Sequence, residues 1–405
     1  MGVNAGAGVS TDRRRLLRGS AAAGGLGLLG LGGCATAQGS GGLAPYDRVP
    51  RLAPVRPHTD RLFDITVCLR PFRAAGPRLD TEMLGDKLVV HNYGHGGSGW
   101  SLSWGSAQVA LGKALSTGAG EIAVIGAGAI GMTTALTAQR AGARVTVYAK
   151  ERTAQARSAR ATGSWTPDSR ISKAADAGPQ FAALWEQMAR TSFKSWRAWL
   201  GLPGTPVEWN DRYNLSDLPP DEARAKRRAE DTMHFGEYAD SIRDLTPRAV
   251  VLPPGSHPFP TAYATRNSSL MFNVTGLAHQ MESDFLLAGG QFEMREFHAP
   301  SELMALPEKV IINCTGYGAR ALWKDESITP VRGQIAWLIP QPEVNYGLYY
   351  KNVSMLSRRD GIVIQATGSE ESGWNDDHEV IDRAEADGAV RTIAEVYDRW
   401  PRRRG

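Results

Sequence analysis

The residues with the clearest chemical role form a glycine pattern, Gly126-x-Gly128-x-x-Gly131. In such a pattern the first glycine permits a tight turn, the second lets the backbone approach a pyrophosphate, and the third allows close helix packing. An apolar run at 121–125 precedes the pattern, 132–141 has helical composition, and 144–148 is a second apolar run. This order predicts a strand–helix–strand unit whose helix N-terminus offers amide donors to the phosphates of a dinucleotide.

The end of the second predicted strand bears on how the dinucleotide is held. An acidic residue is expected there, because it accepts hydrogen bonds from ribose hydroxyls. The sequence reads Tyr148-Ala149-Lys150-Glu151, so Glu151 is the candidate, and Lys150 takes the position that an acid usually fills. The glycine pattern by itself does not distinguish FAD from a nicotinamide dinucleotide.

A second glycine-rich segment resembles a known family. Residues 91–99 read His-Asn-Tyr-Gly-His-Gly-Gly-Ser-Gly, and residues 101–115 after them are predicted to form a helix. This segment resembles the signature of the D-amino-acid and D-aspartate oxidases, which use FAD. Residues 69–73, Leu-Arg-Pro-Phe-Arg, resemble the Arg-Pro-x-Arg segment of the same family. Further matches follow in the family's order between residues 60 and 400, at 161–165, 213–215, 267–270, 312–316, 332–334 and 374–375.

The order of these segments differs from that of the family. There the two active-site motifs lie near the C-terminus, whereas here they precede the glycine pattern. The resemblance therefore implies a circular permutation, with the break after residue 400 and a new join at 113–120. Chain ends at surface loops can be moved without altering a core, and Ser-Thr-Gly-Ala-Gly at 116–120 suits a linker.

The resemblance also implies how the chain is divided. We expect an α/β fold in which a Rossmann-like FAD-binding domain is interleaved with an antiparallel-sheet substrate domain. The expected parts are an export signal (1–33), a flexible tether (34–58), the permuted segment with both active-site motifs (59–115), the dinucleotide-binding unit (116–170), and the remainder of both domains (171–400). The region 382–398 is predicted to be helical.

The catalytic residues follow from the same resemblance. Arg70 is expected to bind the substrate carboxylate through a bidentate fork, a geometry that lysine cannot copy. Gly97 belongs to the loop that faces the flavin ring. The family places two tyrosines over the substrate. Here Tyr350 is the candidate for the first, and the second falls on or near Met355, so that hydroxyl is lost. Lys351 is a candidate for a second anion contact, which would favour an acidic substrate.

The resemblance assigns a further set of residues to FAD. They come from the two glycine segments, from the region after the second predicted strand, and from the 161–165 and 312–316 segments. They are Gly126, Ala127, Gly128, Ile130, Gly131, Glu151, Arg157, Ser158, Gly163, Ser164, Thr315, Gly96, Gly99, Trp100 and Ser101. His91 and His95 are expected to structure their loop. No metal site is predicted, because the histidines and cysteines lack ligand spacing.

The implied reaction is oxidation of a D-amino acid or a related amino or imino acid by hydride transfer to flavin N5. The imino acid then hydrolyses to a 2-oxo acid, and oxygen reoxidises the flavin to give hydrogen peroxide. Alternatives are an amine dehydrogenase with another electron acceptor, a nicotinamide-dependent oxidoreductase, and a flavin-binding protein without turnover. The altered tyrosine positions motivate the last of these.

The N-terminus predicts export. Residues 12–18 read Asp-Arg-Arg-Arg-Leu-Leu-Arg, and a weakly apolar run leads to Cys34. This is similar to a twin-arginine signal joined to a lipoprotein box, with Cys34 lipidated. The expected location is a membrane-anchored lipoprotein or a periplasmic or extracellular protein. Cys68 and Cys314 lie in apolar runs and are predicted to be buried free thiols.

The composition limits the classes of protein to which this chain can belong. The chain has 405 residues, 42% of them hydrophobic, and a formal net charge of +4. The first 33 residues supply four arginines against one aspartate, a net +3, so the rest carries 4 − 3 = +1. This balance argues against a nucleic-acid partner. A chain of this length buries enough core to enclose a cofactor and a small amino-acid-like substrate.

Overall fold

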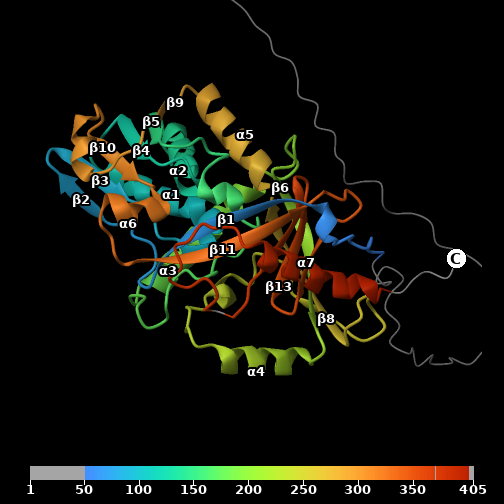
Figure 1. Ribbon diagram of the computed structural model, residues 1–405. Coiled ribbons are helices and arrows are strands. Elements are labelled where there is room, and N and C mark those ends of the chain that lie inside the picture. The colour runs from blue at the N-terminus through green and yellow to red at the C-terminus, as the bar shows by residue number, and fades with distance from the viewer. Residues whose placement is uncertain (1–50, 370, 401–405) are drawn as a thin grey trace, which may run out of the picture. The chain divides into compact units, whose positions relative to one another are not determined.

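The computed structural model describes residues 51–369 and 371–400, which are built around two β-sheets. The first has six strands in the order β2-β3-β10-β4-β5-β9 and is parallel except for β2 at its edge. Its strands are β2 (Thr81–Leu84), β3 (Lys87–His91), β10 (Val310–Asn313), β4 (Glu121–Ile125), β5 (Arg144–Ala149) and β9 (Gln291–Met294). Figure 1 shows this sheet with helices α1, α2 and α5 beside it.

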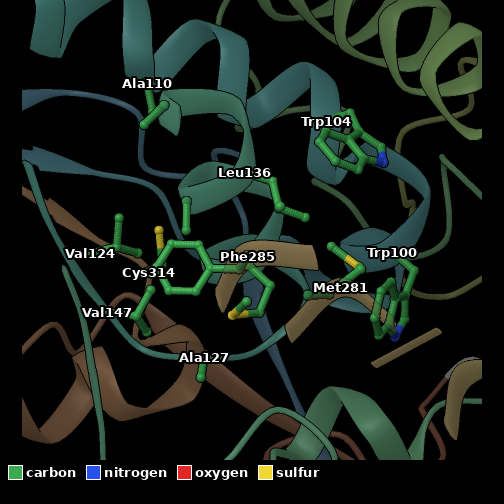
Figure 2. Packing of buried hydrophobic residues seen from close by; sticks show 14 of the residues in the cluster. Trp100, Trp104, Ala110, Val124, Ala127, Leu136, Val147, Met281, Phe285 and Cys314 are labelled. Carbon is green, nitrogen blue, oxygen red and sulfur yellow. The ribbon is translucent and has the colours of Figure 1, made fainter. Parts of the chain in front are cut away.

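Three helices cover the six-stranded sheet because each has an apolar face. They are α1 (Gly99–Leu115), α2 (Ala129–Arg140) and α5 (Val274–Leu287). Figure 2 shows Leu136 of α2 close to Phe285 of α5, with Val124 and Val147 of the central strands in the same cluster. Burying this cluster fixes α2 against β4 and β5, and thereby fixes the glycine turn between them.

The second sheet has eight strands in the order β1-β11-β14-β13-β12-β6-β8-β7. All its neighbours are antiparallel except β12 and β6. The strands are β1 (Leu62–Arg73), β11 (Ile328–Leu338), β14 (Gly361–Ala366), β13 (Val353–Arg358), β12 (Tyr346–Tyr350), β6 (Val207–Ser216), β8 (Tyr263–Phe272) and β7 (Val250–Leu252). Helix α7 (Arg383–Asp398) packs Ala386, Val390 and Ile393 against one face.

The remaining elements are shorter or lie at the border between the sheets. Helix α3 (Phe181–Arg197) packs against α1 at Gly105, where a Cβ would come within 2.2 Å of the Met188 carbonyl oxygen. The others are α4 (Pro220–Glu230), α6 (Ala319–Leu322), and 3-10 turns at Thr59–Arg61, Gly96–Ser98, Arg157–Arg160, Ala239–Ile242, Pro300–Ala305 and Gly316–Gly318.

Most of the predicted elements are confirmed. The strand–helix–strand unit is β4-α2-β5, with its helix beginning at Ala129. The helices predicted at 101–115 and 382–398 are α1 and α7. The predicted α/β fold with one largely parallel and one largely antiparallel sheet is confirmed. Cys68 and Cys314 are buried and free, as predicted.

The N-terminal predictions lie outside the described residues, including the export signal, Cys34 and most of the tether. Within 51–369 and 371–400, no helix is both long enough and apolar enough to cross a membrane. The segment 62–115 is divided between the two sheets. Its strand β1 pairs with β11, and its strand β3 pairs with β2 and β10.

Candidate functional site

A cavity of about 810 Å³ lies between the carboxyl ends of the central parallel strands and the C-terminal half of β1, which lines it with residues 68–71. Its wall includes Ile125 at the end of β4, Ala149 at the end of β5, Cys314 after β10, and Tyr93 after β3. The crevice beyond the carboxyl ends of parallel strands is the usual ligand site of such sheets. The volume falls in the range of about 300–1,000 Å³ that ligand pockets occupy.

The first glycine turn forms one wall of the cavity. Gly126 has a φ of +102°, and a Cβ at this position would lie 2.7 Å from the Cys314 carbonyl oxygen. A Cβ on Gly131 would lie 1.9 Å from the Gly126 oxygen. The turn therefore leads into α2 with its backbone open to the cavity, and the helix N-terminus directs amide groups and a positive dipole end toward it. The Ser158 hydroxyl accepts from the Ala129 amide at 2.9 Å.

The second glycine segment forms another wall of the cavity at the N-terminus of α1. The Gly97 amide donates to the Ser169 carbonyl at 3.0 Å, and a Cβ on Gly97 would lie 2.6 Å from the Ser169 hydroxyl. The Trp100 indole donates to the Ser158 carbonyl at 2.7 Å, which links the two walls. Two helix N-termini thus face one cavity, an arrangement that suits an anionic ligand.

A buried hydrogen-bond network supports the second glycine segment. His95 Nε2 contacts the Ser106 hydroxyl at 2.7 Å, Ser106 donates to Asn92 Oδ1, and Asn92 Nδ2 donates to the Thr134 hydroxyl at 3.1 Å. Burial lowers the pKa of His95 to about 3, so the imidazole is neutral near pH 7. These contacts agree with the expected role of His95 in holding its loop.

His91 is likewise held within the fold. Its Nδ1 lies 3.1 Å from Asn313 Nδ2, and its Nε2 lies 3.3 Å from the Glu82 carboxylate. Burial, together with the nearby Arg78, lowers the pKa of His91. His91 does not line the cavity.

Arg70 lines the cavity from β1. Its Nη1 donates to the Arg332 carbonyl at 3.3 Å. Its guanidinium lies over Gly333 of β11, where a Cβ would come within 2.5 Å of both terminal nitrogens. Among the described acidic residues, none forms a salt bridge with Arg70. Its fork is therefore available to a ligand carboxylate.

The far end of the cavity contains the residues expected near a ribose. Lys150 and Glu151 both line it, and Lys150 Nζ lies 3.5 Å from the Glu296 carboxylate. Within the described part of the chain, Glu151 forms no salt bridge. Lys150, which replaces the usual acid, thus has an exposed ion-pair partner in Glu296, and Glu151 stays the candidate acceptor for a ribose hydroxyl.

Most of the predicted site residues line the cavity together. They are Arg70, Gly96, Gly97, Gly99, Trp100, Gly126, Ala127, Gly128, Ile130, Glu151, Arg157, Ser158 and Thr315.

Four of the residues assigned to FAD lie behind this lining and have packing or hydrogen-bond roles. Gly131 sits against the Gly126 turn, and a Cβ on Gly163 would lie 2.4 Å from the Phe272 carbonyl oxygen. The Ser101 hydroxyl accepts from the Thr166 amide at 2.8 Å. The Ser164 hydroxyl accepts from Arg212 at 3.0 Å.

The structure does not bring Tyr350 to the cavity. Tyr350 is buried between the eight-stranded sheet and α7, and its hydroxyl accepts from Arg399 at 2.8 Å. Lys351 is exposed and pairs with Glu395 at 2.6 Å, and Met355 is buried in the same core as Tyr350. Tyr350 and Met355 lie elsewhere because their side chains extend from the sheet face that packs against α7, and Lys351 lies in the turn between β12 and β13.

Sequence reasoning missed several residues at the cavity. Arg160 lines it beside Arg157, and both contact Glu379, with Arg157 Nε donating at 2.9 Å and Arg160 Nη1 lying 3.6 Å away. The Arg157 guanidinium also lies over the Tyr317 ring at 5.7 Å. Arg160 could have been predicted from the sequence, because it closely follows Arg157 and Ser158, which the resemblance assigns to FAD binding. Glu379 is 222 residues away in the chain and carries no local signal.

Comparisons with known proteins identify the family. The D-amino acid oxidase of Dugesia ryukyuensis is 28% identical over 119 residues, which cover 29% of this chain and 36% of that protein. The D-amino-acid oxidase of Streptomyces coelicolor is 28% identical over 226 residues, covering 53% of this chain and 58% of that protein. The chain thus matches less than two thirds of the length of either relative.

Among solved structures, glycine oxidase from Geobacillus kaustophilus aligns with a TM-score of 0.47 at 15% identity, covering 69% of this chain and 80% of that one. The DAO family, described as FAD dependent oxidoreductases, matches residues 121–403. That match takes in more than half of the chain, including the first glycine turn and most of the eight-stranded sheet. The chain therefore belongs to the DAO family of FAD dependent oxidoreductases.

Proposed function

We propose that this protein binds FAD in the cavity and oxidises an amino acid whose carboxylate is held by Arg70. One observation carries the proposal: the guanidinium of Arg70, unpaired among the described acids, lines the same cavity as two helix N-termini and their glycine turns. A dinucleotide needs the close backbone approach that the glycines permit. An amino acid needs a carboxylate anchor beside it.

The chain's own residues supply binding and orientation. FAD, when bound, supplies the acceptor for the hydride that leaves the substrate α-carbon. The α2 N-terminus and Ser158 suit the pyrophosphate, Glu151 suits a ribose hydroxyl, and the Gly97 segment with the α1 dipole suits the anionic side of the flavin ring. Arg70 fixes the α-carboxylate and so sets which face of the α-carbon is presented. No side-chain base is required, which agrees with the neutral, internally bonded His95.

The finer parts of the function are also proposals. We infer that the substrate is a D-amino acid, supported by the similarity of this chain to the D-amino-acid oxidases of Dugesia ryukyuensis and Streptomyces coelicolor. We infer that oxygen accepts the electrons and yields hydrogen peroxide, with another acceptor as the alternative.

The central test is anaerobic reduction of the purified yellow protein. A panel of paired D- and L-amino acids is mixed with it, and loss of the oxidised flavin absorbance is followed. We expect D enantiomers to bleach the flavin and L enantiomers not to. Arg70→Ala should lower kcat/KM by roughly 100-fold or more, because hydrogen bonds to charged groups contribute about 1.5–3 kcal/mol each. Arg70→Lys should be intermediate because it keeps the charge but loses the fork.

The same samples separate the alternatives. Release of a nicotinamide nucleotide on denaturation, with no flavin, would contradict FAD binding. Bound FAD that no amino acid reduces would favour the flavin-binding protein without turnover. Peroxide formation with matching oxygen uptake supports the oxidase, whereas reduction that persists in air favours a dehydrogenase with another acceptor.

We further propose that the chain is circularly permuted and exported as a lipoprotein. For the permutation, a variant in which residues 60–115 follow residue 400 should fold, bind FAD and keep kcat/KM within about threefold, because chain ends can be moved at surface loops. Failure of that variant to bind FAD would contradict the permutation. For export, Cys34→Ser should abolish incorporation of labelled fatty acid, whereas Cys68→Ser should not affect it. Labelling that survives Cys34→Ser would contradict lipidation at that residue.

A further inference from the structure

Four tryptophan rings pack against one another where helix α1 meets helix α3. Trp196 is at the centre of the group, with its ring centroid 6.1 Å from that of Trp100 and 5.6 Å from that of Trp104. The ring centroid of Trp199 lies 6.0 Å from that of Trp196. Trp100 and Trp104 belong to α1, Trp196 to the last turn of α3, and Trp199 lies two residues beyond the end of that helix. All four are buried, and we call them the tryptophan array.

The tryptophan array leads from the cavity toward the outside of the molecule. Trp100 lines the cavity, and the other three members lie behind it. The Trp100 indole donates to the Ser158 carbonyl at 2.7 Å, which fixes the ring at the cavity wall. Trp199 is 4% exposed, and Gly201, two residues later, is exposed. One end of the array is therefore at the cavity and the other is near the surface.

Rings at these distances can exchange electrons. Indole is among the most easily oxidised side-chain groups, and a flavin excited by light is a strong one-electron oxidant. Electron transfer between rings slows steeply with distance, so rings in van der Waals contact exchange electrons fastest. The centroid distances of 5.6–6.1 Å are those of packed aromatic pairs. An electron taken from Trp100 can therefore be replaced from Trp196, and then from Trp199.

Hydrogen bonds favour one path through the array. The Trp196 indole donates to the Trp100 carbonyl at 2.9 Å, and the Trp100 indole also has a carbonyl acceptor. Oxidation makes an indole N–H a stronger donor, so such an acceptor stabilises the oxidised ring. Trp104 differs, because its Nε1 has no hydrogen-bond partner among the described residues, and the Arg140 guanidinium lies 4.8 Å from its ring centroid. Positive charge is thus disfavoured on Trp104, and the favoured outer end is Trp199.

Helix dipoles favour the same direction. Trp100 lies in the first turn of α1, where the positive end of the dipole disfavours a positive charge. Trp196 and Trp199 lie at the C-terminal end of α3, where the negative end of the dipole favours it. Lys194 and Arg197 also lie in the last turn of α3, but both are exposed, so water and salt screen their charges. A positive charge formed on Trp100 is therefore more stable on Trp196 or Trp199.

We propose that the tryptophan array is a light-driven electron relay, with Trp100 as the donor to the excited flavin and Trp199 as the outer end. One electron leaves Trp100 for the flavin, a second moves from Trp196 to Trp100, and a third moves from Trp199 to Trp196. No bond breaks, and one electron from a soluble thiol or a similar one-electron reductant neutralises the charge left on Trp199. The resulting activity is reduction of the bound flavin by light without an amino acid. This inference rests on the FAD binding of the proposed function and not on amino-acid oxidation.

Flash excitation of the FAD-loaded protein tests the relay without turnover. The readout is the visible absorption of the tryptophan radical cation and the time over which it decays. In Trp196→Phe the charge should stay on Trp100 beside the flavin, because phenylalanine fills much of the same space but is far harder to oxidise. We expect the radical to decay at least about tenfold faster there than in the wild type, a difference of about 1.4 kcal/mol in activation free energy. Trp199→Phe should also shorten the decay, since it removes the outer end.

Trp104→Phe is the matched control. Trp104 belongs to the same array and contacts the same central ring, but it lies off the favoured path. The radical should therefore decay at the wild-type rate in this variant. If Trp104→Phe shortened the decay as much as Trp196→Phe does, the array would be a packing unit and the proposal would be overturned. A radical on Tyr93, Tyr148 or Tyr317, which also line the cavity, in place of a tryptophan radical would overturn it as well.

Steady illumination gives the second arm. The FAD-loaded protein is exposed to blue light without oxygen or amino acid and with dithiothreitol as the reductant, and loss of the oxidised flavin absorbance is followed against a dark sample. The wild type and Trp104→Phe should lose it at the same rate. Trp196→Phe and Trp199→Phe should lose it at least about tenfold more slowly. Equal rates in all four proteins would show that dithiothreitol reaches the flavin directly, and they overturn the relay.

Two further outcomes separate this inference from the proposed function. If light reduces the flavin through the array while no amino acid does so in the dark, the relay stands and amino-acid oxidation does not. If D-amino acids reduce the flavin in the dark and a flash yields no tryptophan radical in the wild type, oxidation stands and the relay is overturned. Should Trp196→Phe not fold, Trp199→Phe decides, because it changes a residue outside the helix. An unchanged radical decay in Trp199→Phe then overturns the proposal.

Discussion

The guanidinium of Arg70 lies directly over the backbone of Gly333, with no space for a Cβ between them. The hypothetical Cβ would lie 2.5 Å from both Nη1 and Nη2 of Arg70. Gly333 therefore sets the position of a side chain on the neighbouring strand. A glycine in mid-strand often marks such a close approach.

Gly333→Ala should move Arg70 without unfolding the sheet. The clash involves the end of a flexible side chain, and Gly333 is not among the positive-φ glycines. We expect KM for the amino acid to rise roughly tenfold or more, since a displaced fork loses hydrogen bonds of about 1.5–3 kcal/mol each. FAD content should not change. Gly112→Ala is the control, because a Cβ on Gly112 meets nothing within 4 Å. An unchanged KM would show that Arg70 does not bind substrate in this position.

Gly126→Ala should impair cofactor binding. Gly126 combines a φ of +102° with a Cβ position 2.7 Å from the Cys314 oxygen, so an added methyl is strained and also displaces the turn. We expect FAD affinity to fall at least tenfold in fluorescence titration. Gly142→Ala is a matched control, because Gly142 has a φ of +92° but open space around its Cβ. The Gly142→Ala substitution should lower the unfolding free energy by about 1–2 kcal/mol, because it introduces backbone strain alone. Equal FAD loss in both variants would contradict the close-approach explanation.

Tyr350→Phe should affect stability more than catalysis. The Tyr350 hydroxyl accepts a hydrogen bond from Arg399 in the core beside α7 and does not line the cavity. Its removal should lower the unfolding free energy by about 1 kcal/mol, measured by urea denaturation. The value of kcat/KM should stay within about twofold. A large loss of kcat with unchanged stability would instead place Tyr350 over the substrate, as the sequence suggested.

The contrast between Tyr350 and the glycine turn shows what local sequence can predict. The turn from Gly126 to Gly131 and its flanking elements follow from spacing within one short segment, and β4, α2 and β5 lie as expected. A side chain's position over a cavity depends instead on strand register, and a shift of one residue reverses the face. Tyr349 pairs with Ser354 on the face that carries Arg212, while Tyr350 packs on the opposite face.

Arg212 and Glu379 show a second limit of prediction from the sequence. Arg212 contacts Ser354 142 residues later in the chain, and Glu379 contacts Arg157 222 residues earlier. Neither residue belongs to a motif, so their placement depends on how the two sheets pack rather than on local pattern. Arg70 was found because a family segment surrounds it. The sequence therefore predicted Arg70 and the glycine turn, whereas the contacts of Arg212 and Glu379 are found only in the structure.

His95 predicts how stability depends on pH. Burial lowers the pKa of His95 from 6.5 to about 3, so the folded protein disfavours its protonated form. The unfolded chain binds this proton below pH 6.5. The stability associated with the neutral imidazole is therefore complete above that pH and is lost as the pH falls toward 3. The slope is about 1.4 kcal/mol per pH unit, so about 2 kcal/mol should be lost between pH 6.5 and pH 5.

Urea denaturation at pH 7, 6 and 5 measures this loss, and His95→Gln isolates it. The glutamine does not titrate in this range, so the difference in unfolding free energy between the two proteins should shrink or reverse as the pH falls. Other titrating groups are common to both proteins and cancel in the comparison. His279→Gln, at an exposed position of α5, controls for removal of an imidazole as such. If the wild-type and His95→Gln curves run parallel from pH 7 to pH 5, His95 is not held neutral. The buried contact between His95 and Ser106 would then not disfavour the protonated imidazole.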